Sequence, residues 1–181
     1  CGYGAILKDF KYPTGITARA ICHPHLRQPW EIHVNKNGDR FFQEDYDSVH
    51  VREKKLLEQP NLMSWIVFDS KIRAESPSIL RDFSKKDEDS FFSNHPMFCV
   101  AESMNDLASL SGIDALGLRR TVNEYNDAIE NNMPDPFNRK HRPLLIKEPP
   151  FFSICTHGTS ITSTVGLAVN KKLQVITSGN E

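Results

Sequence analysis

Cysteine is scarce in this chain of 181 residues, which contains only Cys1, Cys22, Cys99 and Cys155. Their wide spacing includes no C-x-x-C pair, so neither a zinc ribbon nor a dense disulfide framework is expected. Apolar runs are also short, and none approaches the roughly 20 residues of a membrane-spanning helix. No charged leader with an apolar core marks a secretory signal. We therefore expect no membrane segment in this chain, with the cytoplasm as the default location.

An excess of charge of either sign is missing as well. The 22 lysines and arginines nearly balance the 23 aspartates and glutamates, for a formal net charge of -1. Without a basic surplus there is no electrostatic reason to expect nucleic acid or an anionic membrane as a partner. A glycine-rich phosphate turn is absent too, because no G-x-G-x-x-G follows a strand and opens a helix.

What the chain does contain is enough for one domain with a real core. With 181 residues, of which 39% are hydrophobic, the chain can bury a core without splitting into two domains. Periodic apolar positions and capping signals predict helices over residues 48–58, 83–94, 103–111 and 114–129. A Thr-, Val- and Ile-rich tail over residues 151–176 predicts two or three strands. The predicted fold class is α+β, with a mixed β-sheet and flanking helices.

The clearest local feature is an apolar run that ends abruptly in polar residues. Trp65-Ile66-Val67-Phe68 is the pattern of a strand buried on both faces, and Asp69 and Arg73 follow within five residues. Side chains just beyond such a strand are held firmly at the edge of the core, as a catalytic or anion-binding group requires. Arg73 is therefore the best candidate for chemistry, while the plainer alternative is an arginine in a surface ion pair.

A second feature is the stretch of residues 30–44, which alternates apolar and polar residues around an Asn-Gly pair. This pattern predicts a β-hairpin with a type I′ turn at Asn37 and Gly38. In the register of a two-residue loop, Val34 stands opposite Phe41. Glu44 emerges where the second strand ends.

The second half of this hairpin, Gly38-Asp39-Arg40-Phe41-Phe42-Gln43-Glu44, resembles the G-x-R-F-x-N-E element of the FAD-dependent fumarate reductase and succinate dehydrogenase flavoprotein superfamily. There an apolar strand, F-D and a catalytic arginine follow, as Phe68-Asp69 and Arg73 do here. The order continues with a pair of helices over residues 101–113 and 118–126. It ends with D-x-F-x-R at 135–139, x-P-P-F-Y at 148–152 and T-x-G-G-L-x-I-N at 164–170.

The resemblance implies that this chain is a middle segment of a larger flavoenzyme. Residues 1–29 would lead in from a missing FAD-binding domain, residues 30–170 would form the capping domain, and residues 171–181 would return toward the missing domain. FAD would be bound mainly by those missing domains. The implied reaction is flavin hydride transfer that reduces or forms an activated carbon-carbon double bond in a small-molecule enoate or unsaturated ketone. The isolated segment is then expected to be inactive.

The resemblance also assigns roles to individual residues. Arg73 matches the arginine that donates a proton to one carbon of the double bond, and Glu44 matches a glutamate that supports it. The superfamily carries an arginine shortly after that glutamate, whereas here Arg52, from the following helix, is the candidate replacement. The plainer alternative for Glu44 is the solvated end of a strand.

The substrate-binding end departs from the superfamily pattern. Fumarate reductases carry a histidine immediately before T-x-G-G, where this chain has Thr162 and Ser163 followed by Thr164. We expect these three hydroxyls to bind a substrate carboxylate or carbonyl, more weakly than a charged group would. His157 lies too far upstream to fill the histidine's place. The departure favours an acceptor other than fumarate.

Two alternatives remain open at this point. The chain could be a non-catalytic binding or interaction domain that keeps the capping fold. It could also bind a metal through His23 and His25, although two histidines without a third nearby ligand are more often ordinary loop residues. We expect no metal.

Overall fold

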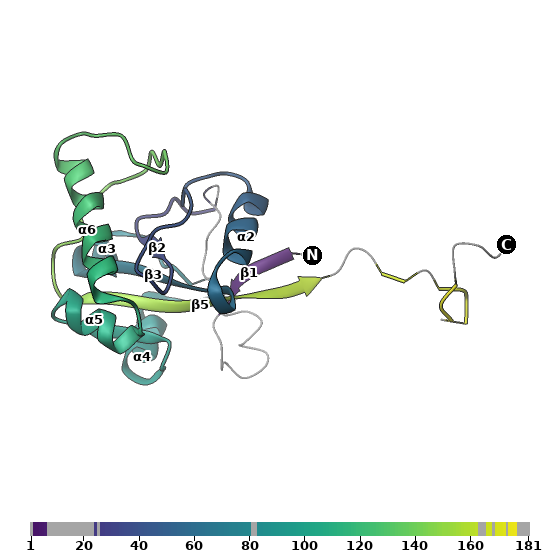
Figure 1. Ribbon diagram of the computed structural model, residues 1–181. Coiled ribbons are helices and arrows are strands. Elements are labelled where there is room, and N and C mark those ends of the chain that lie inside the picture. The colour runs from purple at the N-terminus through teal and green to yellow at the C-terminus, as the bar shows by residue number, and fades with distance from the viewer. Residues whose placement is uncertain are drawn as a thin grey trace.

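The computed structural model describes residues 2–6, 24, 26–80, 83–162, 166–167, 169–172 and 174–176. Its centre is a five-stranded sheet organised around one long strand, β5 (Phe151–Thr162). One edge of β5 pairs with β3 (Met63–Asp69), whose outer edge pairs with β2 (Ile32–Val34). The other edge pairs first with β4 (Phe98–Ala101) and then with β1 (Gly2–Ile6). Figure 1 shows β5 running through the body of the protein.

Five α-helices accompany the sheet in the described part of the chain. They are α2 (Val49–Leu57), α3 (Ser70–Glu75), α4 (Lys85–Asn94), α5 (Met104–Ser111) and α6 (Ala115–Glu130). A short 3-10 helix, η1 (Pro60–Leu62), leads into β3. The predicted caps are confirmed where the pattern was clear: Ser103 caps α5, Asp114 caps α6, and Gly112 ends α5 with a φ of 72°.

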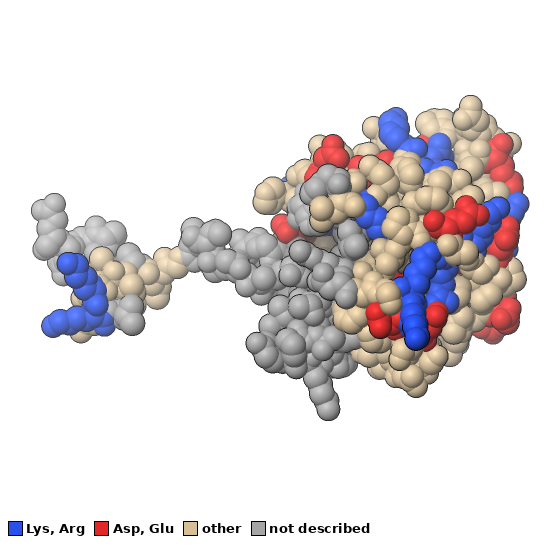
Figure 2. Space-filling model, turned by 180° about the vertical axis from the view of Figure 1, so that it is seen from behind, with Lys and Arg blue, Asp and Glu red and all other residues tan. Residues whose placement is uncertain are grey.

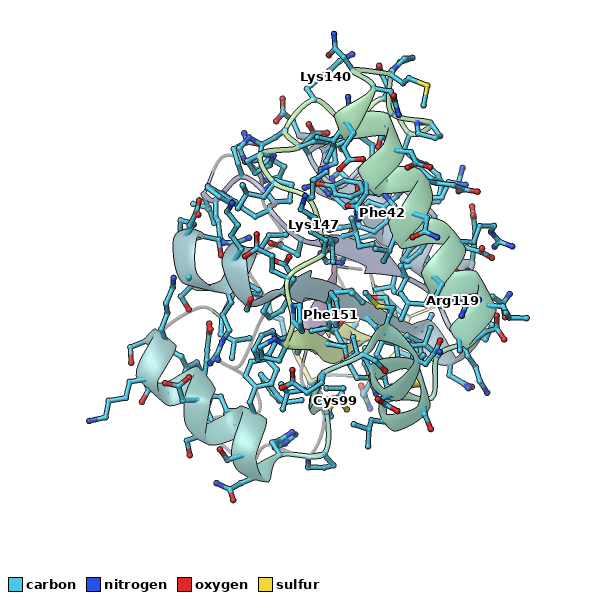
Figure 3. The ribbon with its side chains drawn as sticks, turned by 90° about the vertical axis from the view of Figure 1, so that its left-hand side faces the viewer. Phe42, Cys99, Arg119, Lys140, Lys147 and Phe151 are labelled. Atoms are coloured by element: carbon cyan, nitrogen blue, oxygen red, sulfur yellow. The ribbon has the colours of Figure 1, made fainter. Side chains whose placement is uncertain are left out.

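Helices cover both faces of the sheet, which explains the continuous apolar pattern of β3. Viewed along the strands, α5 and α6 lie on one side of the sheet and α3 and α4 on the other (Figure 3). Because side chains alternate along a strand, Phe152 contacts Phe92 of α4 while its neighbour Ser153 contacts Ser111 of α5. Residues Ser64 to Asp69 are therefore all buried.

Three predictions about strands were wrong. Every named pairing is antiparallel, so the sheet is not mixed. The described residues of the tail form one long strand and an isolated bridge between Val169 and Val175, where two or three strands were predicted. The predicted hairpin forms only a turn, in which a bridge joins Val34 to Arg40 and not to Phe41. This shift of one residue places Arg40 inward.

The turn after β2 takes its position from helix α6. The carbonyl of Lys36 accepts a hydrogen bond from the backbone N–H of Asp114 at 2.9 Å. Gly38 has a φ of 77°, and a Cβ there would lie 2.2 Å from the backbone nitrogen of Leu118. A Cβ on Gly117 would lie 1.8 Å from the carbonyl oxygen of Asn37. The two glycines therefore permit a backbone-to-backbone approach that sets the direction of the chain toward Arg40.

The surface is electrostatically mixed. On the face shown in Figure 2, basic and acidic side chains lie among one another. Within the described residues, each helix falls short of the length and apolarity needed to cross a membrane.

Candidate active site

Arg73 is delivered by a local structure that the sequence sets up directly. The Asp69 carboxylate at the end of β3 accepts the backbone N–H of Ile72 at 2.9 Å and thereby caps α3. Its second oxygen accepts the backbone N–H groups of Lys147 and Glu148, both at 2.9 Å. Asp69 thus joins the start of α3 to the segment before β5, and Arg73 follows in the last turn of that helix.

The Arg73 guanidinium lies between aromatic rings and a carboxylate. Its central carbon is 4.7 Å from the ring centre of Phe152 and 4.9 Å from that of Phe92, which are cation-π distances. Its Nη2 donates to Oδ1 of Asp89 on α4. The side chain of Arg73 is 24% exposed, so this cation is partly accessible at the edge of the core.

Helix α4 is itself held beside Arg73 by the hydrogen bonds of two of its side chains, Glu88 and Lys85. Buried Glu88 accepts hydrogen bonds from the Ser78 hydroxyl and from the backbone N–H groups of Ile79 and Leu80. Lys85 donates to the carbonyls of Arg73 and Ala74 at 2.7 and 2.8 Å, where the end of α3 leaves carbonyls unpaired. The relative position of α3 and α4 is therefore determined by polar contacts in addition to packing.

Glu44 lies in a different environment, a buried charge cluster built from Arg40, Glu44, Asp135 and Arg139. Arg40 makes a two-pronged contact with Glu44 at 2.8 and 2.6 Å and reaches Asp135 at 2.6 Å. Arg139 is 3.5 Å from Glu44 and donates to three backbone carbonyls. Both guanidinium groups also lie near the ring of Tyr125 in α6. The cluster joins the turn after β2, α6 and the loop that follows α6.

The cluster holds its acids ionised. Burial alone would raise the pKa of Glu44, but the positive charges of Arg40 and Arg139 outweigh it and bring that pKa below the usual range. Asp135 behaves in the same way, because hydrogen bonding and charge from Arg40 lower its pKa despite burial. Glu44 is therefore a buried carboxylate, and the alternative of a solvated strand end was wrong.

A small cavity of about 10 Å³ lies next to this cluster, near the lower limit of the space that one water needs. Burial lowers the pKa of His33, on its wall, to about 4, only partly opposed by Glu31 and Glu44. Arg52 from α2 and Glu44 both line this cavity, and the relay role of Arg52 stays a prediction. The residues lining the cavity are Arg27, Pro29, Glu31, His33, Phe42, Glu44 and Arg52.

The buried neutral His33 predicts a pH-dependent stability. The unfolded chain protonates this imidazole below pH 6.5, whereas the folded chain does so only near pH 4. The unfolded state thus binds more protons in this window, so stability falls as the pH is lowered, by about 3 kcal/mol in all. Urea unfolding of the chain at a series of pH values measures this slope. His33→Gln should flatten it between pH 6.5 and 5, and an unchanged slope in that variant would contradict the assignment.

The structure does not bring all predicted site residues together. Arg73 contacts Asp89, while Glu44 contacts Arg40 and Arg139, so the two proposed partners are not hydrogen-bonded to each other. Thr162 is the last residue of β5. Ser163 and Thr164 lie outside the described residues, as do His23 and His25. Among the residues that the structure describes, no group of three or more His, Cys, Asp or Glu is arranged to hold a metal ion.

Sequence reasoning missed two of the groups that surround these side chains. Asp89 lies in the predicted helix over residues 83–94, to which no functional role was assigned. Arg40 was present in the G-x-R-F element, but the predicted register did not turn it inward. The spacing D-x-F-x-R did carry the signal for Asp135 and Arg139, which lie together in the buried cluster.

A model of the FAD binding domain family matches residues 10–181, nearly the whole chain. The chain therefore belongs to this family. That match corrects the expectation that the FAD-binding domain is absent, because the residues assigned to a separate capping domain fall within the matched range. The expected divisions at residues 30 and 170 stay predictions.

Two curated relatives are similar to this chain over nearly its whole length. It is 24% identical over 181 residues to a probable fumarate reductase, Ifc3, of Shewanella frigidimarina strain NCIMB 400, and 27% identical over 188 residues to a fumarate reductase (cytochrome) of Shewanella frigidimarina. Each alignment covers 96% of this chain, but only 28% and 30% of the relative. The chain thus spans less than a third of the length of these relatives.

The fold also resembles a solved structure. The crystal structure of 3-ketosteroid delta1-dehydrogenase from Sterolibacterium denitrificans, in complex with 1,4-androstadiene-3,17-dione, matches with a TM-score of 0.66 at 17% identity. The alignment covers 96% of this chain and 35% of that one. At this identity the likeness establishes the fold alone.

Proposed function

We propose that this chain forms the substrate-side, capping part of an FAD-dependent oxidoreductase that reduces or forms an activated carbon-carbon double bond. The observation that carries the proposal is the placement of Arg73. Its guanidinium lies partly exposed at the edge of the core, against two neighbouring aromatic rings, and is held by the capped helix α3. A rigid, partly desolvated cation of this kind stabilises negative charge that develops on a substrate.

The described residues fit the substrate side of a flavin better than its diphosphate. A diphosphate site of the usual type needs a glycine-rich turn and free N–H groups at a helix start. The starts of α3, α4, α5 and α6 are each capped by a side chain, from Asp69, Ser84, Ser103 and Asp114. The start of α2 has no side-chain cap, but the residues just before it, 44–48, contain no glycine. When bound, FAD would supply or accept the hydride.

The roles of this chain's own residues follow from that arrangement. Arg73 would orient the substrate's electron-withdrawing group or donate a proton to the carbon that does not receive the hydride. Phe92 and Phe152, which pack against each other, cover the same side of the guanidinium and keep water from it there, which strengthens its electrostatic effect. Thr162, Ser163 and Thr164 remain the proposed donors to the substrate's carboxylate or carbonyl.

Two substrate classes are compatible with the proposal. Two of the relatives are named fumarate reductases, whose substrate is an enoate, and one structural neighbour contains an unsaturated ketone. The absence of a histidine before Thr164 favours a carbonyl over a dicarboxylate. We therefore propose that an unsaturated ketone or a monocarboxylic enoate is used in preference to fumarate.

The test is anaerobic reoxidation of the reduced protein that contains this chain. Flavin absorbance is followed after mixing with fumarate, with other enoates and with unsaturated ketones. We expect one class to reoxidise the flavin much faster than the others. A protein without bound flavin, or one that no acceptor reoxidises and no saturated substrate reduces, would overturn the proposal and favour a non-catalytic binding domain.

A further inference from the structure

We propose that Asn37 is a site of spontaneous deamidation, and that the docking of its turn onto α6 holds this reaction back in the folded protein. Asn37 and Gly38 form the only Asn-Gly pair in the sequence. Glycine is the most permissive residue in this place, because it has no Cβ to hinder attack by its backbone nitrogen. The reaction involves no flavin and does not depend on the proposed function.

The chemistry needs only water and the chain itself. The backbone nitrogen of Gly38 loses its proton to hydroxide and attacks the side-chain carbon Cγ of Asn37. A new N–C bond closes a succinimide ring while the carboxamide C–N bond breaks, and the leaving nitrogen takes a proton from water and departs as ammonia. One water molecule then opens the ring and a proton is released. Opening at one carbonyl gives aspartate, and opening at the other gives isoaspartate, whose main chain runs through the side-chain carbon.

The group that is attacked is accessible. The Asn37 side chain is exposed, and within the described part of the chain its carboxamide makes no hydrogen bond. Its Cγ is therefore neither covered nor held away from the next residue by a partner. Protection of this site must come from the attacking nitrogen.

The backbone nitrogen of Gly38 is protected in the folded chain. Its N–H donates to the carbonyl of Asn35 at 2.9 Å, and Gly38 is buried. The proton that must leave is thus held in a hydrogen bond and shielded from hydroxide. The Asn35 carboxamide closes the turn further, because its Oδ1 accepts the backbone N–H groups of Asn37 and Asp39, both at 3.0 Å.

Helix α6 fixes the peptide group between Asn37 and Gly38. Ring closure must swing this group until its nitrogen meets Cγ. The carbonyl oxygen of Asn37 lies so close to Gly117 that a Cβ on that glycine would be 1.8 Å away. The preceding carbonyl, of Lys36, accepts the backbone N–H of Asp114 at 2.9 Å. Because backbone meets backbone here, the swing requires the turn to separate from α6, and the reaction waits for a local opening.

The two products should differ in their effect on the fold. Aspartate keeps the backbone and changes only an exposed side chain. Isoaspartate adds a carbon to the main chain of a turn that has no spare room against α6. We expect the isoaspartate form, separated by chromatography, to unfold at a lower temperature than the unmodified protein. Asn37→Asp, which reproduces the other product, should unfold near the wild-type temperature.

The experiment follows deamidation of the protein that contains this chain, in mildly alkaline buffer with and without urea. A protease that cleaves after glutamate releases residues 32–44, and mass spectrometry detects the exchange of the carboxamide for a carboxylate. We expect folded wild type to react at least about 10-fold more slowly than the urea-unfolded protein, because only the locally opened fraction reacts. Equal rates in the two states would overturn the proposal.

Two glycine variants test the role of α6. Gly117→Ala places a Cβ against the Asn37 carbonyl oxygen and should raise the rate in native buffer toward the unfolded rate. Gly158→Ala on β5 is the matched control, since its Cβ meets only the side chains of Leu56 and Leu62. We expect the control to keep the wild-type rate. If both variants deamidate at the same rate, docking on α6 does not protect the site.

Asn35→Ala covers the case in which Gly117→Ala does not fold. It removes the carboxamide that closes the turn and leaves α6 and both glycines of the contact unchanged. We expect deamidation in native buffer to be faster than in wild type by about 5-fold, the equivalent of one hydrogen bond. Thermal unfolding shows that the variant is folded at the temperature used. A folded Asn35→Ala that reacts at the wild-type rate would refute protection by the turn.

Discussion

Arg73→Ala is expected to lower kcat of the flavin-containing protein by about 100-fold or more, the usual range for loss of a general acid. Under the proposed function, the substitution removes both the proton donor and the positive charge that contacts with Phe92, Phe152 and Asp89 hold at this edge of the core. Arg73→Lys should recover part of the loss, because it keeps a positive charge but not the planar guanidinium that stacks on the rings. Steady-state kinetics with the preferred acceptor measures both effects.

The control for this prediction is Arg119→Ala. Arg119 lies on the exposed side of α6 (Figure 3), away from α3 and α4. We expect its removal to leave kcat unchanged. Thermal unfolding of Arg73→Ala should change little, because a partly exposed cation-π contact contributes only about 0.5–1 kcal/mol. Full turnover by Arg73→Ala would exclude an acid role and favour a non-catalytic domain.

Arg40→Met is expected to destabilise the chain by about 3–5 kcal/mol, the typical cost of removing one partner from a buried ion pair. The substitution leaves the carboxylates of Glu44 and Asp135 buried. Only Arg139 then remains to balance the negative charge of Glu44. Methionine is chosen because it keeps most of the volume and so isolates the loss of charge from the loss of packing. Urea unfolding at neutral pH measures the change.

The matched control is Arg120→Met, at an arginine whose ion pairs with Asp39 and Glu124 are exposed. Its removal should cost no more than about 1 kcal/mol. Equal effects of the two substitutions would show that the cluster contributes no more than surface charges do. A small effect of Arg40→Met alone would mean that the carboxylates become protonated or reach water in the variant.

Local patterns in the sequence were sufficient for several elements. The apolar run around Trp65 predicted β3, and Asp69 at its end became the cap of α3, because these depend on neighbours within a few residues. The same holds for α5 and α6, whose caps and apolar stripes are local signals. The register of residues 30–44 was not predictable in this way, because it is determined by the contact of the turn with α6.

The sequence by itself therefore determined the α+β composition, the placement of Arg73 just beyond a buried strand, and the family to which the ordered motifs point. Only the tertiary structure decided which carboxylate faces which arginine. Arg40 reaches Asp135 across 95 positions and Arg73 reaches Asp89 across 16, and both pairs depend on how separate elements pack. Sequence separation does not identify such long-range pairs, because the entropic cost of closing a loop rises only slowly with its length.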